Sequence, residues 1–145
     1  MERRSVNQMV ALVFGVVYLL VGIAGFFVTK FDNFASPTTK KLIFFEINPL
    51  HNIVHLLIGL FLLGAGRAGQ RAARAANLTV GLAYAVVFLL GLFIAGKTTS
   101  ANFLAINQAD NGLHIVSALL LIVVAIAADK AYTSVGKSTA GATRL

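Results

Sequence analysis

The chain contains no cysteine, and only five of its 145 residues are acidic. Without cysteine it has no disulfide, no thiolate metal ligand and no cysteine nucleophile, and thiol usage does not indicate a compartment. The sequence also lacks a catalytic triad candidate, a glycine-rich phosphate loop and a pair of carboxylates inside an apolar segment. These absences exclude several common classes of enzyme and proton-coupled transport through a pair of buried carboxylates.

Charge of either sign is scarce, and apolar residues are abundant. Hydrophobic residues make up 58% of the chain and charged residues 12%, with a mean hydropathy of +0.85. This composition is too apolar for a water-soluble domain of such length. A hydrocarbon core about 30 Å thick needs about 20 apolar residues per helix, since each residue rises about 1.5 Å. The length therefore allows four membrane-spanning helices.

Four apolar runs, at 9–28, 50–65, 78–95 and 113–128, contain no Asp, Glu, Lys or Arg. They lack the alternation of barrel strands, and only helices and closed barrels span lipid. The sequence predicts an all-α integral membrane protein with a membrane domain at 1–131. Its transmembrane helices are expected at about 8–29, 49–66, 76–96 and 111–129. The segment 132–145, rich in Ser, Thr, Gly and Ala, is expected to be a disordered tail.

Basic residues indicate orientation and lipid contact. Arg3 and Arg4 precede the first run, which is longer than a usual signal-peptide core and has no small-x-small cleavage site, so we expect it to be retained. The N-terminus, middle loop and tail carry eight of the twelve Lys and Arg residues, which places both termini in the cytoplasm. The net charge of +7 lies at helix ends and favours anionic lipid over nucleic acid. Three of the basic residues have two alternative explanations: Arg67, Arg71 and Arg74. They serve either as ordinary charges that set the orientation or as a basic stripe that contacts lipid head groups.

The chain repeats itself weakly. The segment 15–18, which begins with Gly15 and ends with Tyr18, matches 81–84, and Gly25 and Gly91 follow in step. Ile47-Asn48 precedes Leu50-His51 as Ile106-Asn107 precedes Leu113-His114. Two duplicated helical hairpins of the same topology, related by an axis along the membrane normal, would explain this pattern. His51 and His114 would then lie on the same side of the membrane, and the helix glycines would serve close packing.

All three histidines are predicted at the outer ends of the second and fourth helices. His51 and His55 are one helical turn apart, and His114 with Asp110 opens the last helix. These four residues are candidate ligands for zinc or another divalent transition metal. Second-shell partners would come from Glu46, Asn52 and Asn111. Two readings remain beside the metal: a haem held between His51 or His55 and His114, and interfacial histidines that only form hydrogen bonds. Asn48 before Pro49, and Asp110 or Asn111, are expected to cap helices.

Two segments carry a resemblance to a known family. They are 48–59, which begins Asn-Pro-Leu-His-Asn-Ile-Val-His, and 107–114, which reads Asn-Gln-Ala-Asp-Asn-Gly-Leu-His. The chain resembles, over about 7–129, the four-helix actinobacterial membrane proteins grouped as domain of unknown function 4383. The resemblance implies four spans in a bacterial cytoplasmic membrane and no assigned activity. It carries over to five positions without a role: His51, Asn52, His55, Asn111 and His114.

Three hypotheses about function follow. The first is a membrane protein, not an enzyme, whose outward-facing histidine cluster binds a divalent metal. The second is a structural or accessory subunit that binds a larger membrane complex or another copy of itself. The third is a redox membrane protein that uses haem or quinone.

Overall fold

The computed structural model describes residues 3–129 and is almost entirely helical in that range. Four helices follow one another: α1 (Val6–Thr29), α2 (Pro49–Ala68), α3 (Gln70–Ile94) and α4 (Gln108–Ala127). A two-stranded antiparallel ladder, β1 (Lys41–Leu42) with β2 (Phe45–Glu46), lies between α1 and α2. All four helices are long and apolar enough to cross a membrane, which indicates a multi-pass membrane protein. The expected tail at 132–145 lies outside the described residues.

Side-chain caps determine where three of the helices begin. Ser5 and Gln8 form a capping box at α1, and Asn48 caps α2 with Pro49 at the first helical position, as expected. At α4 the cap is Asn107, and Asp110 completes its capping box from inside the helix. Helix α4 therefore begins at 108, before the expected 111. Helix α3 begins at 70, before the expected 76, because its first turns contain mostly Ala, Arg and Gln, which favour helix.

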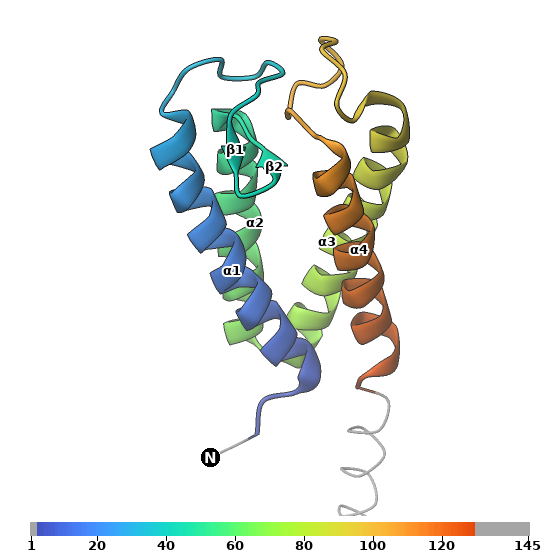
Figure 1. Ribbon diagram of the computed structural model, residues 1–145. Helices are drawn as coiled ribbons and strands as arrows, with labels where there is room; N and C mark the ends of the chain where they lie inside the picture. The colour runs from blue at the N-terminus through green and yellow to red at the C-terminus, as the bar shows by residue number, and fades with distance from the viewer. Residues whose placement is uncertain (1–2, 130–145) are drawn as a thin grey trace, which may run out of the picture.

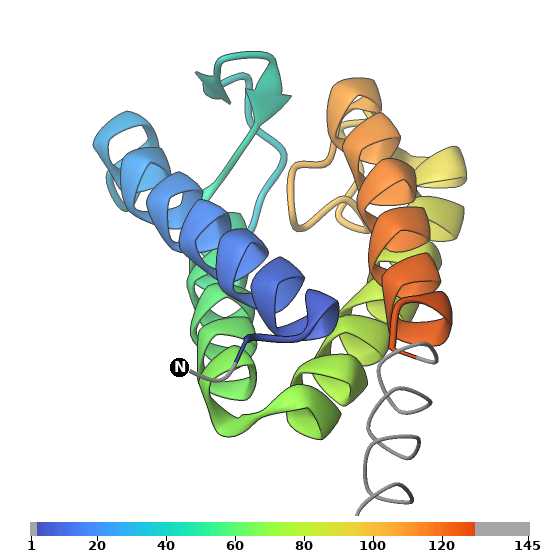
Figure 2. The ribbon, with the colours of Figure 1, turned by 90° about the horizontal axis from the view of Figure 1, so that it is seen from below.

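The helices pair as two antiparallel hairpins, α1 with α2 and α3 with α4 (Figures 1 and 2). Glycines bring the paired helices close together. A Cβ on Gly15 would lie 2.7 Å from Leu63 Cγ, and one on Gly81 would lie 2.8 Å from Ile122 Cγ1. A Cβ on Gly25 or Gly91 would overlap the amide oxygen of a facing asparagine. The predicted packing role of these glycines is confirmed at all four positions.

The two hairpins are joined tightly at the end of the bundle where α1 begins and α4 ends (Figure 1). We call it the closed end. Only Gly69 separates α2 from α3. Its φ is +127°, a backbone conformation that glycine adopts easily. The Asn77 amide donates to the Asn7 carbonyl at 3.1 Å and to the Asn7 side-chain oxygen at 2.9 Å. Asn7 in turn donates to Asp129 and to the Val124 carbonyl. Three helices are thus connected within one polar cluster.

The opposite end, which we call the loop end, holds the two connections 30–48 and 95–107, and the hairpins spread apart toward it (Figure 1). Two asparagine amides connect the hairpins here. Asn48 Nδ2 donates to the Phe103 carbonyl at 2.7 Å, and Asn107 Nδ2 donates to the Phe44 carbonyl at 2.8 Å. Each helix cap therefore binds the loop of the other hairpin, which holds the spread hairpins at a fixed separation.

Candidate functional site

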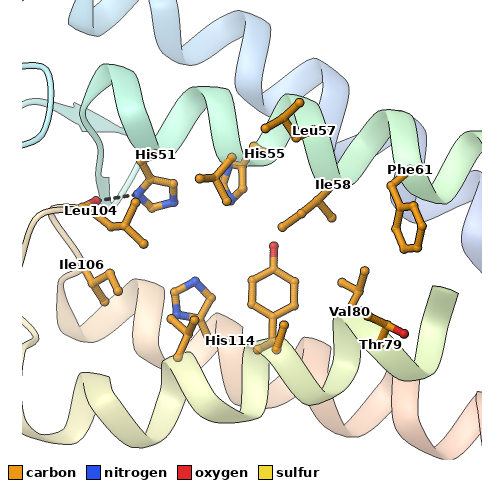
Figure 3. Close-up of a pocket in the computed structure, with 14 residues that line it drawn as sticks. His51, His55, Leu57, Ile58, Phe61, Thr79, Val80, Leu104, Ile106 and His114 are labelled. Carbon is orange, nitrogen blue, oxygen red and sulfur yellow. Dashed lines mark hydrogen bonds between the residues drawn. The ribbon is translucent and has the colours of Figure 1, made fainter.

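Two cavities lie between the hairpins. One, of about 370 Å³, opens between α2 and α3 (Figure 3), and we call it the α2–α3 cavity. The other, the α1–α4 cavity, has a volume of about 290 Å³ and is also lined by the β1–β2 segment. Both are lined almost entirely by apolar atoms. His55, Tyr84 and His114 line both cavities, so these three side chains lie where the two spaces approach each other.

Five rings form a continuous row across the molecule. His51 and His55 are 4.5 Å apart between ring centroids, and Tyr18 lies 5.4 Å from His55. Tyr84 follows at 5.7 Å from Tyr18, and His114 stacks on Tyr84 at 5.1 Å. The row begins and ends with imidazoles from different hairpins. It places all three histidines of the chain around one apolar space.

Three polar atoms of this row have no hydrogen-bond partner although they are buried: His55 Nδ1, Tyr84 Oη and His114 Nδ1. The side chains themselves are 8%, 5% and 6% exposed. His51 differs, because its Nδ1 binds the Leu104 carbonyl at 2.9 Å. A buried polar atom without a partner costs about 1–3 kcal/mol. The side chains that line the two cavities therefore have unused capacity for hydrogen bonds.

Helix register places the two unpartnered imidazoles at corresponding depths. His55 follows the cap Asn48 by seven residues, and His114 follows the cap Asn107 by the same seven. Tyr18 and Tyr84 each follow a packing glycine by three. Aligned by their caps, His114 corresponds to His55. This differs from the repeat seen in the sequence, which matched it to His51.

The structure brings together the predicted ligand residues only in part. His51, His55 and His114 line the α2–α3 cavity, whereas Asp110 lines the α1–α4 cavity. In residues 3–129, no group of three or more His, Asp or Glu side chains is placed to hold a metal ion. The divalent metal, zinc or another, stays a prediction, as does haem.

The predicted second-shell residues have other contacts. Asn52 donates to Thr29 Oγ1 at 2.9 Å and lies against Gly25, and Asn111 lies against Gly91. Both side chains thus pack inside their own hairpins. Glu46 Oε1 lies 3.7 Å from the ammonium nitrogen of Lys41.

The three predicted lipid-contacting arginines are exposed at the closed end. Arg67 is in the last turn of α2, and Arg71 and Arg74 are in the first turns of α3. Arg74 Nε donates to the Ala125 carbonyl at 2.7 Å. One of the three therefore also connects α3 to α4.

The tyrosines are the residues that sequence reasoning missed. Tyr18 and Tyr84 were not among the predicted site residues, yet both lie in the row of rings, and the Tyr84 hydroxyl is unpartnered. The available signal was the shared spacing from Gly15 and Gly81, which puts one tyrosine at the same level of each hairpin.

A family model described as domain of unknown function (DUF4383) matches residues 8–127. Comparison with curated proteins and with solved structures gives no match.

Proposed function

We propose that this chain, which belongs to the DUF4383 family, binds a lipid-soluble small molecule between two duplicated helical hairpins in the bacterial cytoplasmic membrane. The observation that carries the proposal concerns three polar side chains, those of His55, Tyr84 and His114. They line two apolar cavities, and each has a buried polar atom without a hydrogen-bond partner.

The membrane location is supported by what the helices expose. Large apolar side chains cover their outer faces, among them Phe27 at 83% and Phe93 at 71% exposure. Such a surface is stable only against lipid or another apolar surface. The start of α1, the end of α4 and the exposed arginines lie at the closed end (Figure 1). The excess of Lys and Arg in the N-terminal, middle and C-terminal segments favours the cytoplasm for that end. The cavities then lie nearer the outer leaflet.

The duplication is supported by matched contacts in the two hairpins. Gly25 faces Asn52 as Gly91 faces Asn111. Ring distances repeat as well, since Tyr18 lies 5.4 Å from the first hairpin's His55 and Tyr84 lies 5.1 Å from the second hairpin's His114. Two copies of one ancestral hairpin would produce both pairs of contacts.

Ligand binding is supported by volume and polarity together. Cavities of about 370 and 290 Å³ lie at the lower end of the size range of small-molecule sites, which combine apolar walls with a few placed polar groups. A ligand that carries a polar group would supply a hydrogen-bond partner to His55, Tyr84 or His114. An apolar ligand body would fill the rest of the space.

The direct test is to identify what the protein retains. Protein purified in mild detergent is extracted with organic solvent, and the extract is analysed by mass spectrometry against a mock purification. We expect a lipid-soluble compound in near-stoichiometric amount that His55→Leu/His114→Leu loses. Gln8→Leu is the matched control, because Gln8 donates to the Gly66 carbonyl at the closed end. Retention of the same compound by the double variant would overturn the proposal.

A divalent metal is the second candidate, and one observation favours it. The bond from His51 Nδ1 to the Leu104 carbonyl fixes the ring and leaves Nε2 for a ligand, as in many metal-binding histidines. His55, one turn along, would be the second protein ligand, and the described residues supply no third. Elemental analysis separates the candidates: a metal lost in His51→Ala/His55→Ala, with no retained organic compound, would favour the ion. A stoichiometric protein partner in native membranes would instead support the accessory-subunit hypothesis.

A further inference from the structure

We infer, building on the proposed function, that the ligand is a quinone or its quinol: a neutral ring with polar oxygens at opposite ends and an apolar tail. The imidazoles of His55 and His114 come from different hairpins, and each has a nitrogen without a partner. They occupy corresponding positions, seven residues after Asn48 and Asn107. Figure 3 shows His55 and His114 projecting into the same cavity from different helices. A ring with an oxygen at each end offers one partner to each hairpin.

The chemistry of imidazole fits both redox forms of such a ring. A neutral imidazole carries its proton on either nitrogen, so each ring nitrogen donates in one tautomer and accepts in the other. His55 and His114 can therefore donate to the carbonyl oxygens of a quinone or accept from the hydroxyls of a quinol. The Tyr84 hydroxyl, which is also unpartnered, both donates and accepts. This flexibility would be unnecessary for a ligand with a single fixed polar group.

The charge of the site argues against the common anionic lipids. None of the described residues that line either cavity is Lys or Arg. A carboxylate or phosphate placed there would be buried without a countercharge, which costs far more than burying a neutral carbonyl. The cavities therefore disfavour fatty acids and phospholipid head groups and favour a ligand with an uncharged head group.

The shape of the α2–α3 cavity provides for the tail. From His55 its lining continues along α2 through Ile58 to Phe61, and Val80 faces it from α3 (Figure 3). The six helical steps from His55 to Phe61 span about 9 Å at about 1.5 Å per residue. This apolar extension gives an alkyl or isoprenoid tail a path away from the imidazoles.

The experiment measures binding of three probes to the full-length protein in nanodiscs by equilibrium dialysis. The probes share a decyl tail: a 1,4-benzoquinone with two carbonyls, a cyclohexenone with one, and benzene with none. We expect saturable binding with an affinity that decreases from the quinone to the cyclohexenone to the benzene probe. His55→Leu and His114→Leu should each weaken quinone binding about five- to tenfold, the usual effect of losing one hydrogen bond. Decylbenzene binding should stay unchanged in both variants.

Tyr84→Phe keeps the proposal testable if a histidine variant fails to fold, because it removes one unpartnered hydroxyl and keeps the ring. It should weaken quinone binding about fivefold. Gln8→Leu, at the closed end, is its control and should leave quinone binding unchanged. Equal saturable binding of all three probes, unaffected by the variants, would overturn the quinone while leaving a lipid-soluble ligand in place. No saturable binding of any probe would overturn both.

Discussion

Asn48 and Asn107 perform the same two functions in opposite hairpins. Each side-chain oxygen accepts a backbone N–H at the start of its own helix, from His51 at 2.9 Å and from Asp110 at 3.0 Å. Each amide nitrogen donates to a loop carbonyl of the other hairpin, at 2.7 and 2.8 Å. The same two side chains thus begin the helices that carry His55 and His114 and hold those helices across the cleft.

Asn48→Ala and Asn107→Ala should each lower the free energy of unfolding by about 2 kcal/mol, since each loses a helix cap and a hydrogen bond between hairpins. Asn48→Ser and Asn107→Ser should recover about half of that loss, because serine caps a helix but is too short to reach the opposite loop. Denaturant titration in mixed micelles, followed by circular dichroism, measures the difference. If Ser were as damaging as Ala at both positions, the cap would contribute nothing.

Gly25→Ala and Gly91→Ala should each destabilise the protein by about 1–3 kcal/mol, the usual cost of forcing extra volume into a packed contact. In both, the new methyl group would overlap the oxygen of Asn52 or Asn111. Gly64→Ala is the control, because no atom lies within 4 Å of a Cβ at that helix position. It should stabilise by up to about 1 kcal/mol through helix propensity. Similar unfolding midpoints for all three variants would contradict this.

Asn77→Leu should weaken the closed end by about 1–3 kcal/mol, because it removes both donations to Asn7. Thr79→Val, an exposed change two residues along α3, serves as the control and should change stability little. Thermal unfolding in the same detergent compares the two. An unchanged midpoint for Asn77→Leu would mean that the polar cluster is dispensable for joining the hairpins.

Tyr84→Phe should stabilise the ligand-free protein by about 1 kcal/mol or more, since it removes a buried hydroxyl that has no partner. The same change is expected to weaken binding of the ligand. A gain in stability with a loss of binding is the pattern of a side chain retained for function. Unfolding of wild type and variant, each stripped of bound lipid, provides the measurement, and a loss of stability would show that the hydroxyl is already satisfied.

The number of helices and the family followed from the sequence because both depend on local patterns. Four uncharged apolar runs predict four helices, and the segment around His51 and His55 carried the family resemblance that the match over 8–127 confirms. The start of α3 at Gln70 was missed because Ala-Arg segments are polar enough to suggest a loop although they favour helix.

The site was harder to predict because it depends on register between distant segments. The sequence repeat paired His114 with His51, because each histidine follows a leucine. Counting from the helix caps instead pairs His114 with His55. The hydroxyl of Tyr84 gives no sign in the sequence that it lacks a partner. The bonds from Asn48 to Phe103 and from Asn107 to Phe44 go to backbone carbonyls, which no residue pattern reveals.

The reciprocal asparagine bonds follow the rule of an isologous interface, in which residue i contacts j and j contacts i, as in a two-fold dimer. In a true dimer any substitution appears on both sides of the axis. A single chain is free of that constraint, so its two hairpins can carry different residues at one position while the rest of the interface stays matched. His51 and Asp110, each the third residue of a capped helix, are such a position. One half presents an imidazole and the other a carboxylate, which gives a nearly symmetric cleft two chemically different ends.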